Sequence, residues 1–196
     1  MKTLQRRLAL AAASLLAACA GGPAPVAAPK PAGTPPAVVP AAIATAPDQV
    51  LKLAVAARGV QIYECRAAAG NRHEWAFVAP EAELLDAGGR TVGRHGAGPH
   101  WTFDGGTPQA ATFPGRVTAR VTGRADAPRA GAIPWLRLEA PATTPSAAPA
   151  EGGDLRSIQR INTSGGLAPA DGCQPADAGR RVRVPYTADY LFYGER

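Results

Sequence analysis

From Gln49 onward the chain alternates apolar and polar residues at every second position, the pattern of half-buried β-strands. The clearest example is segment 116–122, where valine and alanine alternate with arginine and threonine. Glycine, proline, asparagine and aspartate interrupt the pattern at short intervals, and long stretches with helical periodicity are absent. The same alternation predicts strands over residues 50–56, 60–66, 74–78, 90–95, 116–122, 135–140, 157–163, 181–184 and 190–193.

The predicted fold is therefore all-β, a single sandwich or barrel-like domain of about seven to ten short antiparallel strands. The 22 glycines and 20 prolines of the chain leave little room for helices. Arg58-Gly59 is expected to separate the first two strands, and residues 81–86 are expected to form an acidic loop. Gln61, Tyr63 and Cys65 share one strand face, which we expect to point inward.

The first residues have the order of a secretory signal peptide, with a basic start, an apolar run from Leu8 to Leu16 and small residues before Cys19. The stretch Leu16-Ala17-Ala18-Cys19 resembles a bacterial lipobox. This resemblance implies removal of residues 1–18 as a signal peptide and lipidation of Cys19. We expect an exported lipoprotein held in the cell envelope by its lipid. Ala20 is not an inner-membrane retention acid, so the outer membrane is the expected location.

Residues 19–47 are almost entirely Ala, Pro, Gly and Val, and predict a semi-rigid linker between the lipid and the folded domain, residues 48–196. The full chain carries a formal charge of +6. Loss of Lys2, Arg6 and Arg7 with the signal leaves 18 basic against 15 acidic residues, or +3. Because the remaining arginines are spread along the domain among acids, no nucleic-acid partner is expected.

Cys65 and Cys173 remain once Cys19 is assigned to the lipid. In an exported protein such a pair is first interpreted as a disulfide, because the envelope is oxidising. The alternative is a reactive or metal-binding thiol pair, but the sequence has neither a C-x-x-C spacing nor a histidine at ligand spacing. No metal site and no cofactor are predicted.

An ordered set of segments resembles the domain of unknown function 3455, a family of exported bacterial and fungal proteins. The resemblance implies a compact, mainly β, exported domain with the two cysteines paired, and it implies no particular activity. At position 100 this chain has a histidine where the family more usually has threonine. The segments are Gly59-Val60-Gln61-Ile62-Tyr63-Glu64-Cys65, residues 78–84, residues 93–101, Ile133-Pro134-Trp135-Leu136, residues 158–163 and residues 184–190.

The best candidate ligand site is formed by His95, His100 and Trp101 around a glycine-rich turn, with Asp104 beyond it. Backbone access at glycines, an imidazole and an indole surface suit a small ligand. The alternative is a surface turn with solvated histidines and a tryptophan that fills the core. Two imidazoles alone do not make a zinc site.

Other polar groups are weaker candidates. Glu81 and Glu83 could serve as acid and base if they are not simply solvated. Gln159, Arg160 and Asn162 form a second polar group, whose arginine could clamp a carboxylate. A nucleophile elbow, a dinucleotide fingerprint and a P-loop are all absent from the sequence.

These observations predict a binding or structural module of the envelope with an undefined small-molecule or protein partner. Whether the protein is an enzyme stays open, and the sequence favours a non-enzyme. The first alternative is a hydrolytic or metal-assisted enzyme that uses the His95–His100 loop. The second is a protein-docking domain that extends its edge strand, with residues 190–193 as the expected edge.

Overall fold

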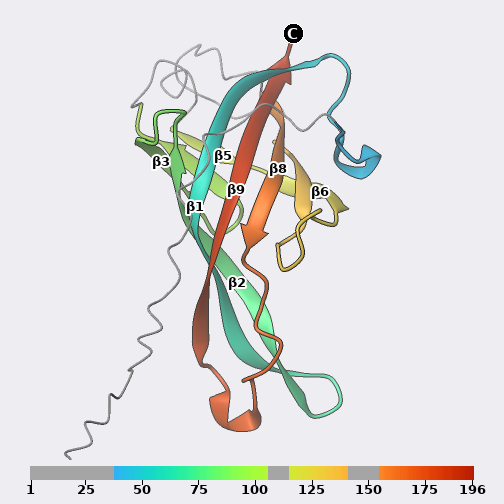
Figure 1. The fold of residues 1–196 in the computed structure, drawn as a ribbon, viewed down its shortest axis with the longest axis vertical. Coiled ribbons are helices and arrows are strands. Elements are labelled where there is room, and N and C mark those ends of the chain that lie inside the picture. Colours follow the sequence, from blue (N-terminus) through green and yellow to red (C-terminus); the bar gives the residue numbers. More distant parts are fainter. Residues whose placement is uncertain (1–37, 106–114, 141–154) are drawn as a thin grey trace, which may run out of the picture.

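The computed structural model describes residues 38–105, 115–140 and 155–196, and these form one antiparallel sheet that curls into a nearly closed barrel (Figure 1). The all-β prediction is confirmed, and the single sheet decides for the barrel over the sandwich. Within the described residues the strand order is β5-β4-β3-β2-β1-β9-β8-β7-β6. The elements are η1 (Ala41–Ile43), β1 (Gln49–Ala68), β2 (Arg72–Leu85), β3 (Thr91–Gly96), β4 (His100–Phe103), β5 (Arg116–Thr118), β6 (Arg120–Ala125), β7 (Trp135–Glu139), β8 (Leu155–Gly165), η2 (Pro175–Asp177) and β9 (Arg181–Glu195).

The connection between the two edge strands explains why the sheet closes. β5 and β6 lie at opposite ends of the strand order, yet only Ala119 separates them in the chain. The sheet must therefore curl until its edges approach each other. Val117 is buried as predicted, but Val121 is 50% exposed, so the expected single strand over 116–122 is wrong in its second half.

β1 and β2 approach very closely at Gly59. A side chain there would place its Cβ only 2.0 Å from the carbonyl oxygen of Glu81. The glycine thus permits close backbone contact within a continuous strand and does not mark a turn. The predicted break at Arg58-Gly59 is wrong, because β1 pairs without interruption with β9 through this point.

β1, β2 and β9 continue beyond the barrel as a three-stranded arm, which points downward in Figure 1. β2 has no β3 neighbour before Ala82, so Pro80 sits where no hydrogen bond from its nitrogen is required. The prediction of an acidic loop over 81–86 is therefore wrong for most of that segment, since β2 runs to Leu85. β9 is likewise a single strand where the sequence predicted two.

β9 pairs with β1 on one side and with β8 on the other. The segment 190–193 is therefore central in the sheet, and the prediction that it forms a free edge is wrong. Tyr190 and Phe192 point into the barrel core, whereas Leu191 and Tyr193 join a smaller cluster on the outer surface.

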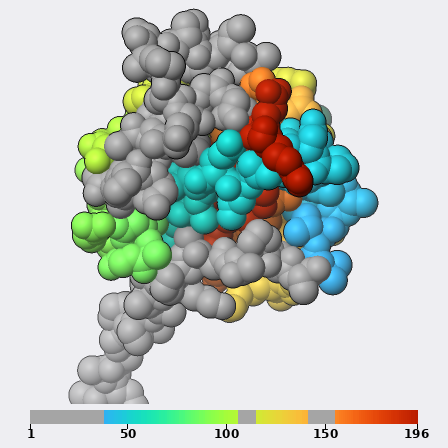
Figure 2. Space-filling model, turned by 90° about the horizontal axis from the view of Figure 1, so that it is seen from above, coloured from blue at the N-terminus to red at the C-terminus, as the bar shows by residue number. Residues whose placement is uncertain are grey.

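The last part of the predicted linker, residues 38–47, packs on this outer cluster. Ile43 in η1 is fully buried against Trp135 and Leu191, and its carbonyl oxygen accepts a 2.7 Å hydrogen bond from the Gln159 amide. Figure 2 shows the segment 38–47 in blue against the side of the barrel. The packed domain thus begins before residue 48. Burial of the apolar Ile43 side chain lowers the free energy relative to its exposure to water in an extended linker.

Candidate functional site

Two of the three predicted ligand-site residues lie in the barrel interior. His95 on β3 is paired in register with Trp101 on β4, and both side chains project inward. Their rings stack with centroids 4.7 Å apart and planes 10° apart. His95 is 5% exposed and Trp101 is fully buried. The interpretation of His95 as a solvated turn residue is therefore wrong, whereas Trp101 does fill the core.

His100 has a different role in the geometry. Its side chain is half-buried, and its Nδ1 lies 2.6 Å from the carbonyl oxygen of Ala97 within the turn. Its own carbonyl oxygen lies 2.8 Å from Nδ1 of His95. Because a carbonyl only accepts hydrogen bonds, Nδ1 of His95 carries the proton. The two histidines therefore do not converge on one point, and His100 instead fixes the tautomer of His95.

Sequence reasoning missed the partners that β9 supplies. The ring of Tyr190 lies 5.0 Å from His95 and 5.4 Å from Trp101, so three rings from three strands meet. Tyr186 lies two residues before Ala188 on β9. Both side chains face the interior, and both are buried. The alternation of β9 was visible in the sequence, but its pairing partner was not.

β1 and β8 complete the interior polar cluster, which we define as Gln61, His95, Trp101, Arg160, Tyr186 and Tyr190. Gln61 is 2% exposed and its chain lies beside Tyr186 near Gly166. At Gly166, where φ is +86°, a Cβ would come within 2.8 Å of Tyr186, so glycine is required there. Arg160 pairs in register with Tyr190 and is only partly buried.

Several donors in this cluster are buried without a hydrogen-bond partner among the described residues. They are Nε2 of Gln61, Nε1 of Trp101 and the hydroxyl groups of Tyr186 and Tyr190. The Tyr186 hydroxyl lies within reach of Tyr190 and of Gln61, and the Tyr190 hydroxyl lies within reach of Arg160, but these contacts lack good hydrogen-bond geometry. Such groups are uncommon in native interiors, where an ordered water, an ion or a ligand usually completes their hydrogen bonds.

Burial dominates the electrostatics of the cluster. It lowers the pKa of the His95 imidazole from 6.5 to about 4, so this side chain is neutral at pH 7. The hydrogen bond to His100 opposes this shift, and the charge of Arg160 adds to it. Burial also raises the pKa of Tyr186 and of Tyr190, and the charge of Arg160 opposes this effect at both. The interior is thus neutral except for Arg160.

The predicted acids lie outside this interior. Glu81 forms an ion pair with Arg183, and Glu83 lies 3.6 Å from Arg58, both pairs being exposed. The hydrogen bond from Arg183 lowers the pKa of Glu81. Neither acid therefore reaches His95, and the geometry does not support the acid–base pair that the sequence permitted.

The second polar group predicted from the sequence is divided between the two faces of β8. Gln159 and Asn162 act on the outer face, where Gln159 holds η1 and Asn162 donates to Asp189. Arg160 alone points inward, where its Nε and Nη2 both donate to the carbonyl oxygen of Pro134, at 3.2 and 2.8 Å.

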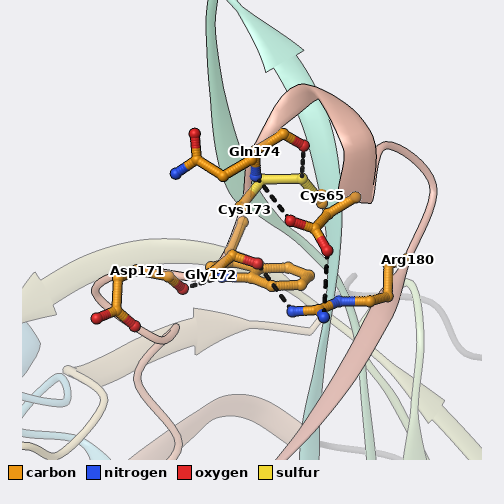
Figure 3. Close-up of polar contacts among 8 residues, drawn as sticks. Cys65, Asp171, Gly172, Cys173, Gln174 and Arg180 are labelled. Carbon is orange, nitrogen blue, oxygen red and sulfur yellow. Dashed lines mark hydrogen bonds and ion pairs between the residues drawn. A yellow bond between two sulfur atoms is a disulfide. The ribbon is translucent and has the colours of Figure 1, made fainter.

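Cys65 and Cys173 are joined by a disulfide near the tip of the arm (Figure 3). The indole nitrogen of Trp75 donates to the carbonyl oxygen of Asp171, and the guanidinium of Arg180 lies 5.2 Å above the Trp75 ring. The predicted disulfide is confirmed, so the alternative of a free or metal-binding thiol pair does not apply. Among the residues that the structure describes, no group of three or more His, Cys, Asp or Glu could hold a metal ion.

Cys19, the signal peptide 1–18 and the linker up to residue 37 lie outside the described residues. In the described ranges, no helix is long and apolar enough to cross a membrane.

The fold and its interior define a disulfide-closed, barrel-like β domain with a polar aromatic centre. The chain belongs to the family described as "Protein of unknown function (DUF3455)", whose model matches residues 46–194. The resemblance noted in the sequence is thereby confirmed. No significant match was found among curated proteins or among solved structures.

Proposed function

We propose that this protein is an exported lipoprotein, anchored through Cys19 in the outer membrane, whose barrel binds a small molecule at the interior polar cluster. The observation that carries the proposal is a group of neighbouring buried donors on β1, β4 and β9 that lack well-formed hydrogen bonds. Ligand sites are typically enclosed, largely apolar and equipped with a few convergent polar groups. The stacked His95 and Trp101 supply the rigid wall of such a site.

A hydrolytic enzyme receives less support from the same geometry. Hydrolysis requires an activated nucleophile or water together with a general acid or base in reach. His95 is neutral, but Glu81 and Glu83 face outward in ion pairs with arginine. The donors in the cluster are suited to holding a ligand rather than to moving protons.

Native mass spectrometry of the full chain, purified from its membrane in detergent, tests this proposal. We expect a defined mass that leaves on unfolding in addition to the lipid. The Tyr190→Phe variant should retain the fold, because only one hydroxyl is lost, but should carry less of that mass. Leu167→Ala, at a 45% exposed position, is the matched control. A chain that carries only its lipid in both backgrounds would show that solvent fills the cluster, and would reject the proposal.

A further inference from the structure

The interior polar cluster contains one permanent positive charge and no acid to balance it. Burial is the main influence on the pKa of Tyr63, His95, Tyr186 and Tyr190, and the charge of Arg160 lowers all four. No Asp or Glu contributes to any of these shifts. Arg160 also pairs in register with Tyr190, so its charge lies close to the titratable side chains of the cluster, whose surroundings are otherwise neutral.

Several arginines on the outer surface have an acidic partner. Arg156, four positions earlier on β8, pairs with Glu195 at 2.6 Å, and Arg183 pairs with Glu81. Within the described ranges Arg160 has no such ion pair; its side chain donates to the Pro134 carbonyl and also lies within reach of the Tyr190 hydroxyl. A partly buried cation without a counter-charge is costly, so an anion is the natural complement.

The Pro134 contact also positions the guanidinium. Because Nε and Nη2 share one acceptor, one edge of the planar group is fixed, and the guanidinium also lies close to the Tyr190 hydroxyl. Arg160 keeps part of its surface exposed, so a solute can reach it from solvent. The buried groups beyond it, on Gln61, Trp101, Tyr186 and Tyr190, all offer N–H or O–H donors.

We propose that the ligand is a small oxyanion, a carboxylate or a phosphate, held by Arg160 and by the donors of Gln61, Trp101, Tyr186 and Tyr190. This inference rests on the proposed function and adds the charge and chemical class of the ligand. An oxyanion offers several acceptor lone pairs to donors that lack a well-formed hydrogen bond within the protein. Charge-assisted hydrogen bonds from arginine to such oxygens are among the strongest that proteins form.

The test is a titration of the full chain in detergent with sodium benzoate, sodium succinate and inorganic phosphate, at constant ionic strength set with chloride. We expect a saturable rise in melting temperature with at least one of these anions and none with chloride. The anion that responds separates a carboxylate from a phosphate ligand. Arg160→Gln should weaken the affinity about tenfold or more, whereas Arg156→Gln should leave it unchanged.

If Arg160→Gln does not fold, Arg160→Lys and Tyr190→Phe are tested in its place. Each of these variants should weaken anion binding without abolishing it. The absence of a saturable response to all three anions, or an equal response in Arg160→Gln, would overturn the inference. If native mass spectrometry then finds a neutral ligand, the binding function stands and only the anionic class is rejected. If it finds none, both proposals fall.

Discussion

The side chain of His95 shows how one buried residue gives the domain a dependence on pH. Its imidazole is stacked on Trp101, packed near Tyr190 and bonded through Nδ1 to the carbonyl of His100. Burial among these groups favours the neutral ring, and the hydrogen bond to His100 opposes this effect only in part. Since burial lowers its pKa to about 4, the folded protein does not bind the proton that the unfolded chain takes up below about pH 6.5.

We therefore expect the free energy of unfolding to be fully maintained above pH 6.5 and to fall as the pH is lowered toward 4. A shift from 6.5 to about 4 corresponds to roughly 3 kcal/mol. Urea unfolding of the wild type and of His95→Gln between pH 7 and 4.5 measures this. The amide of His95→Gln can still donate to His100 but does not titrate, so its pH slope should be small.

His100→Gln controls for the neighbouring imidazole and should keep the wild-type slope. The hydroxyl groups of Tyr186 and Tyr190 stay protonated throughout this range, because burial raises the pKa of both. An equal slope in the wild type and in His95→Gln would show that other groups cause the loss of stability.

At the scale of elements, the arm formed by β1, β2 and β9 depends on its covalent link. The arm extends away from the barrel core, and exposed ion pairs such as Glu64–Arg181 and Glu81–Arg183 link its strands. Exposed pairs of this kind contribute little to stability. The Cys65–Cys173 disulfide, in contrast, closes a loop with a sequence separation of 108 residues.

We expect the double variant Cys65→Ala/Cys173→Ala to lose about 2–5 kcal/mol of stability, because a long loop in the unfolded chain is no longer restricted. Alanine suits these buried positions better than serine, which would bring in a hydroxyl without a partner. Urea denaturation followed by near-UV circular dichroism measures the loss. Reduced wild type should unfold at the same urea concentration as the double variant, and a midpoint equal to that of oxidised wild type would contradict the expectation.

At the scale of the whole molecule, a linker is predicted to connect the packed barrel to a lipid anchor in the membrane. Residues 38–47 run along the outside of the barrel and are held by Ile43. The domain would therefore be attached to the predicted linker at a fixed place on its surface. The lipid itself is a proposal that rests on the sequence around Cys19.

Cys19→Ser should abolish lipidation and release the protein from the membrane fraction, since serine lacks the thiol that receives the lipid. Metabolic labelling with a fatty-acid analogue, followed by membrane fractionation, measures both effects. Cys65→Ala/Cys173→Ala is the control, because it removes the other cysteines and should leave labelling intact. Equal labelling of wild type and Cys19→Ser would rule out this anchor.

Local pattern was enough to predict several features of the domain. The two-residue alternation predicted a β fold and placed Tyr63 and Cys65 on one inward face, and both are buried. The absence of long helical periodicity predicted the lack of helices in the core. These properties depend on neighbouring residues, because side chains in a strand alternate with a fixed period of two.

Only the tertiary structure decided which distant residues meet. Gly59 looked like a turn, but it marks a close approach between two strands whose pairing is not local. His95 looked like a solvated turn residue, but the closure of the sheet buries it against Tyr190 on β9. Arg160 was one of several polar residues on β8 until the barrel separated it from the outer-facing Gln159 and Asn162.

By itself, then, the sequence determined the strand content, the inward faces and the cysteine pair, while the tertiary structure decided the barrel closure and the composition of the interior cluster. The physical reason is that strand pairing joins residues far apart in the chain, through hydrogen bonds whose choice of partner leaves no local pattern.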